Sequence, residues 1–140
     1  MGASITLRRR LEWLDTDAAV RWHHATLWRY AEAAEAELHR RLGISDRTFG
    51  FTPRRRVEAE FHAPVQFDDE VAIDLEVVAL GRTSLTYAVR LSVDERSVAA
   101  APIVAVFVDG RGRPQAWPDD LARALRDGVA VGVRGDGVTA

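Results

Sequence analysis

The segment from Leu11 to Glu35 reads LEWLDTDAAVRWHHATLWRYAEAAE, and it decides the fold because a strand ends and a helix begins within it. Apolar and polar residues alternate from Ile5 to Trp13, which predicts a strand. The alanine- and glutamate-rich part that follows predicts a helix that begins near His23 or His24. Between the two lies Asp17, a carboxylate in a loop before the unpaired amides of a helix N-terminus.

An acid beside a helix N-terminus is a chemically useful arrangement. The amides carry partial positive charge and can hold a carbonyl oxygen, so the spacing predicts acyl transfer. Asp17 is a candidate for the catalytic carboxylate, as a nucleophile or as a base toward water, and the backbone amide of His24 is a candidate for polarising the carbonyl. The alternative is that Asp17 only caps a turn or the helix, as aspartate often does. Asp15 is interpreted as a structural residue.

The rest of the chain predicts one α+β domain. Apolar residues at helical spacing predict an amphipathic helix from 25 to 42, with Gly43 as its C-cap. Strand-like runs follow at 54–61, 70–80, 84–93 and 98–108, and a short helix is expected from Pro118 to about Arg126. We therefore expect a five-stranded antiparallel sheet, one long helix and a short C-terminal helix in a domain of residues 1–127, followed by a tail of residues 128–140.

Composition excludes several classes of protein. The chain has 140 residues, a formal net charge of −2 and no cysteine, which argues against general nucleic-acid binding and excludes disulfides and thiolate metal sites. All 19 basic residues are arginines. No apolar run is long enough to span a bilayer, and the N-terminus does not have the pattern of a secretory signal, so we expect a cytoplasmic protein without a membrane partner.

Three stretches carry a resemblance to a known family. Residues in the first stretch that match its pattern are Trp13, Asp15, Asp17, Arg29, Tyr30 and Glu32. The second stretch is VEAEFHAPVQFDDEVAIDLEVVALGRTSLTY, residues 57–87, and the third is VFVD at 106–109. In these motifs the chain resembles the hotdog-fold thioesterases of the 4-hydroxybenzoyl-CoA thioesterase type, which include small acyl-CoA thioesterases. The resemblance covers about residues 5 to 125.

The resemblance has implications for function. It implies a hotdog fold, with the sheet wrapped around the long helix, and hydrolysis of an acyl thioester of coenzyme A or of an acyl carrier protein. It also implies a homodimer or homotetramer with active sites between subunits. No metal or redox cofactor is expected, because a thioester is activated enough for a carboxylate and oriented amides, and coenzyme A is part of the substrate.

One departure from the family pattern concerns the loop after Asp17. Val20 and Arg21 stand where the family usually has glycine and then histidine or isoleucine. A β-branched residue disfavours the positive φ that glycine allows, so the loop is expected to take another path. This departure favours a second hypothesis from a different class, a non-catalytic module that binds acyl-CoA. A dehydratase or hydratase of the same fold is the third.

The residues around Asp17 suggest how an acyl group could be bound. Trp22, His23 and Trp28 are candidates for lining the acyl pocket, and His23 could also relay a proton. The alternatives are core or subunit contacts for the tryptophans and a polar helix entrance for the histidines. A metal site built from Asp17 and both histidines is not predicted, because adjacent histidines on a helix do not face one ion. Glu32 is interpreted as structural, paired with Arg29 or another neighbour.

Candidates for binding coenzyme A are arginines, because guanidinium groups bind phosphate in a bidentate manner. They are Arg82 and Ser84 in the segment GRTS, and Arg54 in the run RRR at 54–56. The same run could instead bind the acidic surface of a carrier protein or be a solvated strand start. The identity of the acyl group, and the choice between coenzyme A and carrier protein, stay open at this stage.

Overall fold

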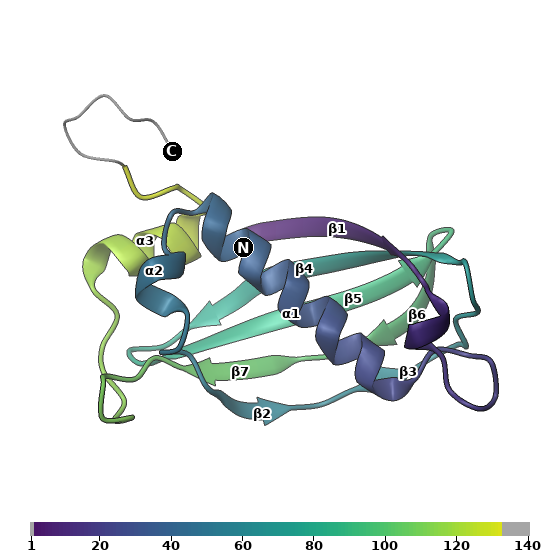
Figure 1. The fold of residues 1–140 in the computed structure, drawn as a ribbon. Helices are drawn as coiled ribbons and strands as arrows, with labels where there is room; N and C mark the ends of the chain where they lie inside the picture. The colour runs from purple at the N-terminus through teal and green to yellow at the C-terminus, as the bar shows by residue number, and fades with distance from the viewer. Residues whose placement is uncertain (1, 133–140) are drawn as a thin grey trace.

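The computed structural model describes residues 2–132 and shows one long helix, α1, lying across a curved antiparallel sheet (Figure 1). The predicted hotdog architecture is confirmed. The elements are β1 Ser4–Arg10, η1 Trp13–Asp15, α1 His24–Arg41, α2 Ser45–Thr48, β2 Arg54–Val57, β3 Glu60–Phe61, β4 Glu70–Leu80, β5 Ser84–Val93, β6 Arg96–Ala100, β7 Ile103–Val106 and α3 Asp119–Asp127.

Helix α1 begins and ends as the sequence predicts. His23 is its N-cap, and Gly43 follows its C-terminus with a φ of 72° that favours glycine. Its inner face consists of small and branched apolar side chains that bring the helix close to the sheet and are themselves buried; the residues of this face are Leu27, Ala31, Ala34 and Leu38. Each buried leucine contributes about 2 kcal/mol to stability. No helix among residues 2–132 is long and apolar enough to cross a membrane.

Two of the five predicted strands are each broken in two, so the sheet has seven strands. The run 54–61 divides into β2 and β3, and the run 98–108 divides into β6 and β7 and ends at Val106. Pro102 lies at the second break, where its missing amide ends the ladder. The breaks lie side by side, because β2 pairs with β7, β3 pairs with β6, and the amide of Glu58 donates to the carbonyl of Pro102 at 3.1 Å.

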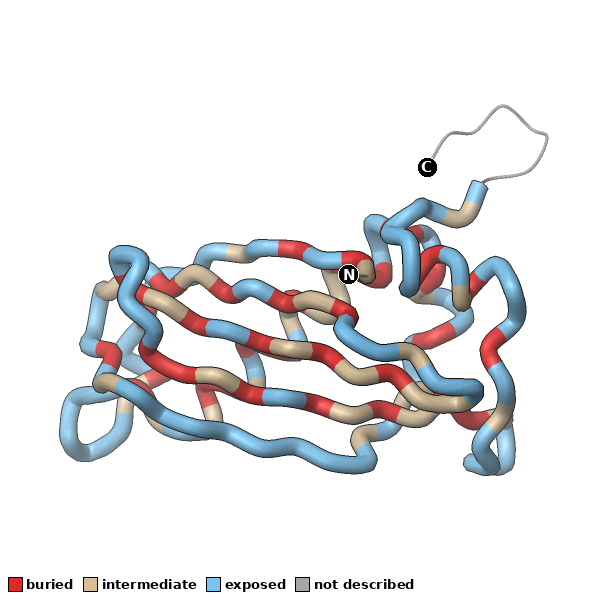
Figure 2. Tube along the Cα trace, turned by 180° about the vertical axis from the view of Figure 1, so that it is seen from behind, coloured by how far each residue is buried: buried red, intermediate tan, exposed pale blue. Residues whose placement is uncertain are grey.

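The sheet has one edge at β1 and the other along β2 and β3. β4 lies between β1 and β5, and β5 pairs with both β6 and β7. The second edge is exposed along almost its whole length, including the apolar side chains Val57 and Phe61, which are 46% and 45% exposed. It is the mostly blue lower border of the molecule in Figure 2. An open edge with apolar side chains is a surface that soluble proteins usually pair or cover.

The C-terminal helix α3 packs against β4 through fully buried Leu121 and Leu125. It ends at Asp127, and Gly128 follows in the left-handed conformation. Of the tail predicted for 128–140, residues 133–140 lie outside the described residues.

Candidate active site

Asp17 lies at the start of a tight turn that leads into α1. Its amide donates to the carbonyl of Arg21 at 2.8 Å, and the amide of Val20 donates to its carbonyl at 3.0 Å. The side-chain oxygen Oδ1 accepts from the amide of Ala19 at 2.8 Å. The side chain is exposed, and within residues 2–132 no donor binds its second oxygen, Oδ2. Asp17 therefore caps the turn with one oxygen and presents the other to solvent.

The expectation that Val20 diverts this loop is wrong. Val20 adopts a φ of 62°, the left-handed conformation that a glycine would favour. The chain is held there from both sides, because the turn is closed at Asp17 and Arg21 bridges to Gln66. Val20 is 56% exposed, so its side chain does not clash with the core. Its left-handed conformation destabilises the fold through backbone strain alone.

This strain gives a testable prediction. Val20→Gly is expected to raise the free energy of unfolding by about 1 kcal/mol, because relief of a left-handed β-branched residue outweighs the entropy that glycine adds to the unfolded chain. Chemical denaturation measures the change. Val20→Ala is the control. It should raise the free energy of unfolding by less than Val20→Gly, since alanine keeps the Cβ atom. A Val20→Gly protein that is less stable than the parent would contradict the strain.

Asp15 ties this loop to the helix, as its structural interpretation requires. Its buried carboxylate accepts from the amide of Glu12 at 2.9 Å, from the hydroxyl of Tyr30 at 3.3 Å and from the guanidinium of Arg29. Burial, together with the charge of Asp15, raises the pKa of Tyr30 well above its usual range, so this hydroxyl stays a donor. Because Arg29 pairs with Asp15, the suggested Arg29–Glu32 pair is absent from the ion pairs of residues 2–132.

Among residues 2–132, the amide of His24 at the N-terminus of α1 has no hydrogen-bond partner. The Nδ1 atom of His23 accepts from the amide of Ala25 at 3.0 Å, and the amide of Thr26 donates to the carbonyl of His23 at 2.9 Å. The two histidine rings stack at 4.3 Å between centroids. Within residues 2–132 no hydrogen bond uses the amide of His24. The group that the sequence suggests as the polarising donor is therefore available to a ligand.

A pocket of about 440 Å³ lies beside Asp17. Its lining residues are Asp17, Ala19, Arg21, Trp22, Phe61, His62, Ala63 and Pro64. Trp22 is buried and meets Phe61 edge to face at 5.7 Å. His23 and Trp28, the other two residues predicted to contact the acyl group, are not in this lining, and Trp28 packs against the core instead.

The contribution of the edge strand to this pocket was missed by sequence reasoning. Phe61 ends β3 and His62 follows it, with Nδ1 of His62 2.8 Å from the hydroxyl of Ser97 and Nε2 2.9 Å from the carboxylate of Glu60. The segment EFHAP at 60–64 is part of the family resemblance, but no local pattern indicates that it meets Asp17, because the two are far apart in the chain.

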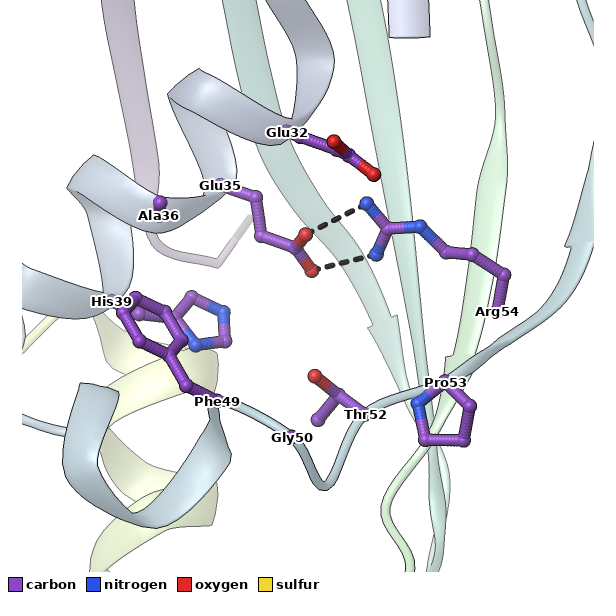
Figure 3. Close-up of a pocket in the computed structure, with 9 residues that line it drawn as sticks. All are labelled: Glu32, Glu35, Ala36, His39, Phe49, Gly50, Thr52, Pro53 and Arg54. Carbon is purple, nitrogen blue, oxygen red and sulfur yellow. Dashed lines mark hydrogen bonds and ion pairs between the residues drawn. The ribbon is translucent and has the colours of Figure 1, made fainter. Parts of the chain in front are cut away.

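A second pocket, of about 400 Å³, lies between α1 and the segment 49–54 (Figure 3). Here Glu35 and Arg54 form a bidentate ion pair, with contacts of 2.7 and 2.9 Å, and their side chains are only 13% and 28% exposed. Glu32 lies beside them on the same helix. The role predicted for Arg54 in binding coenzyme A stays a prediction, and a phosphate would have to displace Glu35 from it.

A buried network lies beneath this second pocket. Nδ1 of His39 is 2.6 Å from the hydroxyl of Thr48, and Nε2 is 2.7 Å from the hydroxyl of Tyr87. The Thr48 hydroxyl also donates to the carbonyl of Ile44 at 3.0 Å, so the network is tied to the backbone before α2. Burial lowers the pKa of His39 and raises that of Tyr87, so both stay uncharged at neutral pH.

Arg82 and Ser84 lie at the turn between β4 and β5, at the opposite end of the sheet from the loop that carries Asp17 (Figure 1). Their carbonyls accept from the backbone amide and the indole of Trp117, each at 3.0 Å, while the Arg82 side chain is exposed. One subunit alone thus does not bring the residues predicted to bind coenzyme A to Asp17. Residues 2–132 also contain no group of three or more potential metal ligands.

A curved antiparallel sheet wrapped around one long helix is the hotdog fold. The sequence model of the thioesterase superfamily matches residues 21–100, and the chain belongs to that family. The acyl-CoA thioester hydrolase YbgC of Escherichia coli O6:H1 is 28% identical over 124 residues, which are 84% of this chain and 92% of that protein.

Solved structures show the same fold. A predicted thioesterase from Bacillus stearothermophilus superposes with a TM-score of 0.82 at 24% identity, covering 93% of this chain and all of that one (100%). A thioesterase from Thermus thermophilus, solved in complex with coenzyme A and zinc, superposes with a TM-score of 0.77 at 25% identity, covering 86% of this chain and 90% of that one.

Proposed function

We propose that this thioesterase hydrolyses acyl-CoA, with the thioester bound between Asp17 and the N-terminus of α1. Two observations support the proposal: Asp17, in the loop before α1, has a carboxylate oxygen open to solvent, and within residues 2–132 the amide of His24, the first residue of α1, has no hydrogen-bond partner. The relative from Escherichia coli is named for acyl-CoA thioester hydrolysis, and the similar protein from Thermus thermophilus was solved with coenzyme A. Both support the same substrate class.

The chemistry follows from these two groups. In one route Oδ2 of Asp17 attacks the thioester carbonyl, coenzyme A leaves as the thiolate, and water hydrolyses the mixed anhydride. In the other, Asp17 takes a proton from a water molecule that attacks directly. In both routes the His24 amide donates to the oxygen as it gains negative charge. Neither route requires a metal or a redox cofactor.

The alternative function is acyl-CoA binding without catalysis. Its sequence argument was that Val20 would displace the loop, and Val20 instead adopts the conformation open to glycine. Release of free thiol over a panel of acyl-CoA and acyl carrier protein substrates tests the proposal. We expect steady turnover well beyond one equivalent per subunit, whereas binding without thiol release would support the alternative.

We also propose that the working unit is a dimer joined along the β2–β3 edge, with a tetramer as a further possibility. An open edge that carries Val57 and Phe61 favours antiparallel pairing with a second copy. The reversed partner would bring its own β4–β5 turn to the same end of the assembly as Asp17. Arg82 and Ser84 therefore stay proposed contacts for the phosphates of coenzyme A, from across the interface.

Sedimentation at micromolar concentration tests this interface. We expect no folded species of 15.5 kDa in the parent protein. Val57→Asp should shift the population toward monomer, because a charge would be buried in the paired edge. Val78→Asp, an equally exposed valine on β4, is the control and should leave the assembly unchanged. A parent protein that sediments only as a folded monomer would contradict the interface.

A further inference from the structure

We propose that Ser97, His62 and Glu60 form a second acyl-transfer centre, in which Ser97 is the nucleophile, His62 is the base and Glu60 orients the base. We call these three residues the Ser97 cluster. Its substrates are small activated esters, because the cluster lies open on the surface of the protein. The inference goes beyond thioester hydrolysis at Asp17 and does not depend on it.

The first argument is the pair of hydrogen bonds that His62 makes. Its Nδ1 lies 2.8 Å from the hydroxyl of Ser97, and its Nε2 lies 2.9 Å from the carboxylate of Glu60. A carboxylate only accepts hydrogen bonds, so Nε2 carries a proton. In the neutral imidazole Nδ1 is then the acceptor, and the Ser97 hydroxyl donates to it. A hydroxyl bound to a base that a third group orients is the arrangement of an activated nucleophile.

The second argument is an irregularity in β6 that brings Ser97 to the other two residues. Glu60 and His62 are two positions apart at the end of β3, so their side chains point to the same side of the strand. In β6, buried Ala99 pairs with the residue between them, and regular alternation would turn Ser97 to the side of Ala99. The register between β5 and β6 instead skips Val98, and this bulge turns Ser97 toward Glu60 and His62.

The third argument concerns access and competing nucleophiles. Ser97 is exposed, and the side chains of His62 and Glu60 are 35% and 82% exposed, so a small ester can reach the hydroxyl. The chain has no cysteine and no lysine, so no thiol or lysine amine competes for an acyl group. Its arginines stay protonated and do not attack carbonyl carbons. The Ser97 hydroxyl is therefore a side chain well placed to accept an acyl group.

The reaction follows from these positions. Oγ of Ser97 attacks the ester carbonyl while Nδ1 of His62 takes the hydroxyl proton, and the carboxylate of Glu60 stabilises the imidazolium. The bond to the leaving oxygen breaks, and the leaving group departs with the electron pair and receives the proton from Nδ1. Water then attacks the acyl-serine ester with His62 again as base, which releases the acid and restores Ser97.

Release of p-nitrophenol from p-nitrophenyl acetate tests the reaction. Asp17→Asn should release it as fast as the parent protein, which separates this activity from thioester hydrolysis. Added to Asp17→Asn, Ser97→Ala or His62→Gln should lower the rate by at least about 100-fold, the scale for losing a nucleophile or its base. Glu60→Gln should cause a smaller loss, because it removes the charge opposite the imidazolium and leaves the base in place. An unchanged rate in Ser97→Ala or in His62→Gln would overturn the proposal.

Covalent labelling of the folded parent protein locates the nucleophile without any substitution. A fluorophosphonate loses fluoride to an activated serine and leaves a stable phosphonate ester, which peptide mass spectrometry assigns to a residue. We expect the adduct on Ser97, and a labelling rate lower by at least about 100-fold in His62→Gln. Absence of an adduct on Ser97 in the parent, or an equal rate in His62→Gln, would overturn the proposal.

Two matched variants control both measurements. Ser92→Ala removes the serine that lies directly opposite Ser97 on β5. Glu58→Gln removes an acid of the same sheet edge that pairs with Arg56. Both should keep the esterase rate and the labelling of the parent protein. Losses in these controls equal to those in Ser97→Ala and Glu60→Gln would assign the effects to the sheet edge in general and contradict the cluster.

Discussion

Asp15→Ala is expected to lower the free energy of unfolding by about 3 kcal/mol. The buried Asp15 carboxylate receives three donors, one from the Glu12 amide, one from Tyr30 and one from Arg29. Alanine leaves the Tyr30 hydroxyl and the Glu12 amide without their acceptor, and the loop loses its side-chain link to the helix. Urea denaturation followed by circular dichroism measures the change.

Two variants control this prediction. Asp15→Asn keeps an acceptor oxygen and should lose less stability, since mainly the charge opposite Arg29 is removed. Asp17→Ala removes a carboxylate that is exposed and bound to one amide, so it should cost about 1 kcal/mol or less. An Asp15→Ala protein within about 0.5 kcal/mol of the parent would show that the network is not what holds the loop.

Much of the fold could be predicted because its signals are local. The helical spacing of Leu27, Ala31, Ala34 and Leu38 and the glycine at 43 determine the length of α1 without reference to the sheet. The alternation in β4 and β5 likewise reports one buried face. Predictions from these patterns are correct because the local preference of each segment agrees with its tertiary environment.

The strand breaks were missed because hydrophobic alternation does not report where a strand bends. Pro102 was visible, but the apolar run around it gave the stronger signal. Nothing between Val57 and Glu60 breaks a strand by its chemistry, so the break between β2 and β3 follows from their pairing with β7 and β6, which are separated at Pro102. The prediction that Val20 displaces its loop was wrong for a related reason. Hydrogen bonds at Asp17 and between Arg21 and Gln66 hold the loop, and they outweigh the preference of valine for a negative φ.

The candidate site also contains some features that the sequence predicts locally and others that depend on the tertiary structure. Asp17 and His24 are seven residues apart in the chain, so the prediction that they act together is local and stays a prediction. The ion pair of Glu35 and Arg54 joins a helix to a strand, and the sequence showed Arg54 only as the first member of a charged run. Which arginine of such a run faces inward is determined by the sheet. The contribution of Phe61 and His62 to the Asp17 pocket has the same tertiary origin.

Asp17→Asn should fold and assemble normally yet lose at least about 100-fold in kcat, the usual scale for removing a positioned base or nucleophile. Asparagine keeps the size of the side chain and an oxygen for the amide of Ala19, so the turn is preserved. Only the charge and the basicity are lost. His24→Ala is the matched control, because it keeps the backbone amide, and His23→Ala should affect stability more than chemistry because His23 caps the helix.

The most direct test is thiol release by Asp17→Asn and by the parent protein, side by side at saturating acyl-CoA, after sedimentation has shown the same assembly. We predict a kcat lower by at least about 100-fold in the variant, with His24→Ala close to the parent. Near-full turnover by Asp17→Asn, together with an inactive His23→Ala or His24→Ala, would contradict the assignment and transfer the chemistry to the histidines.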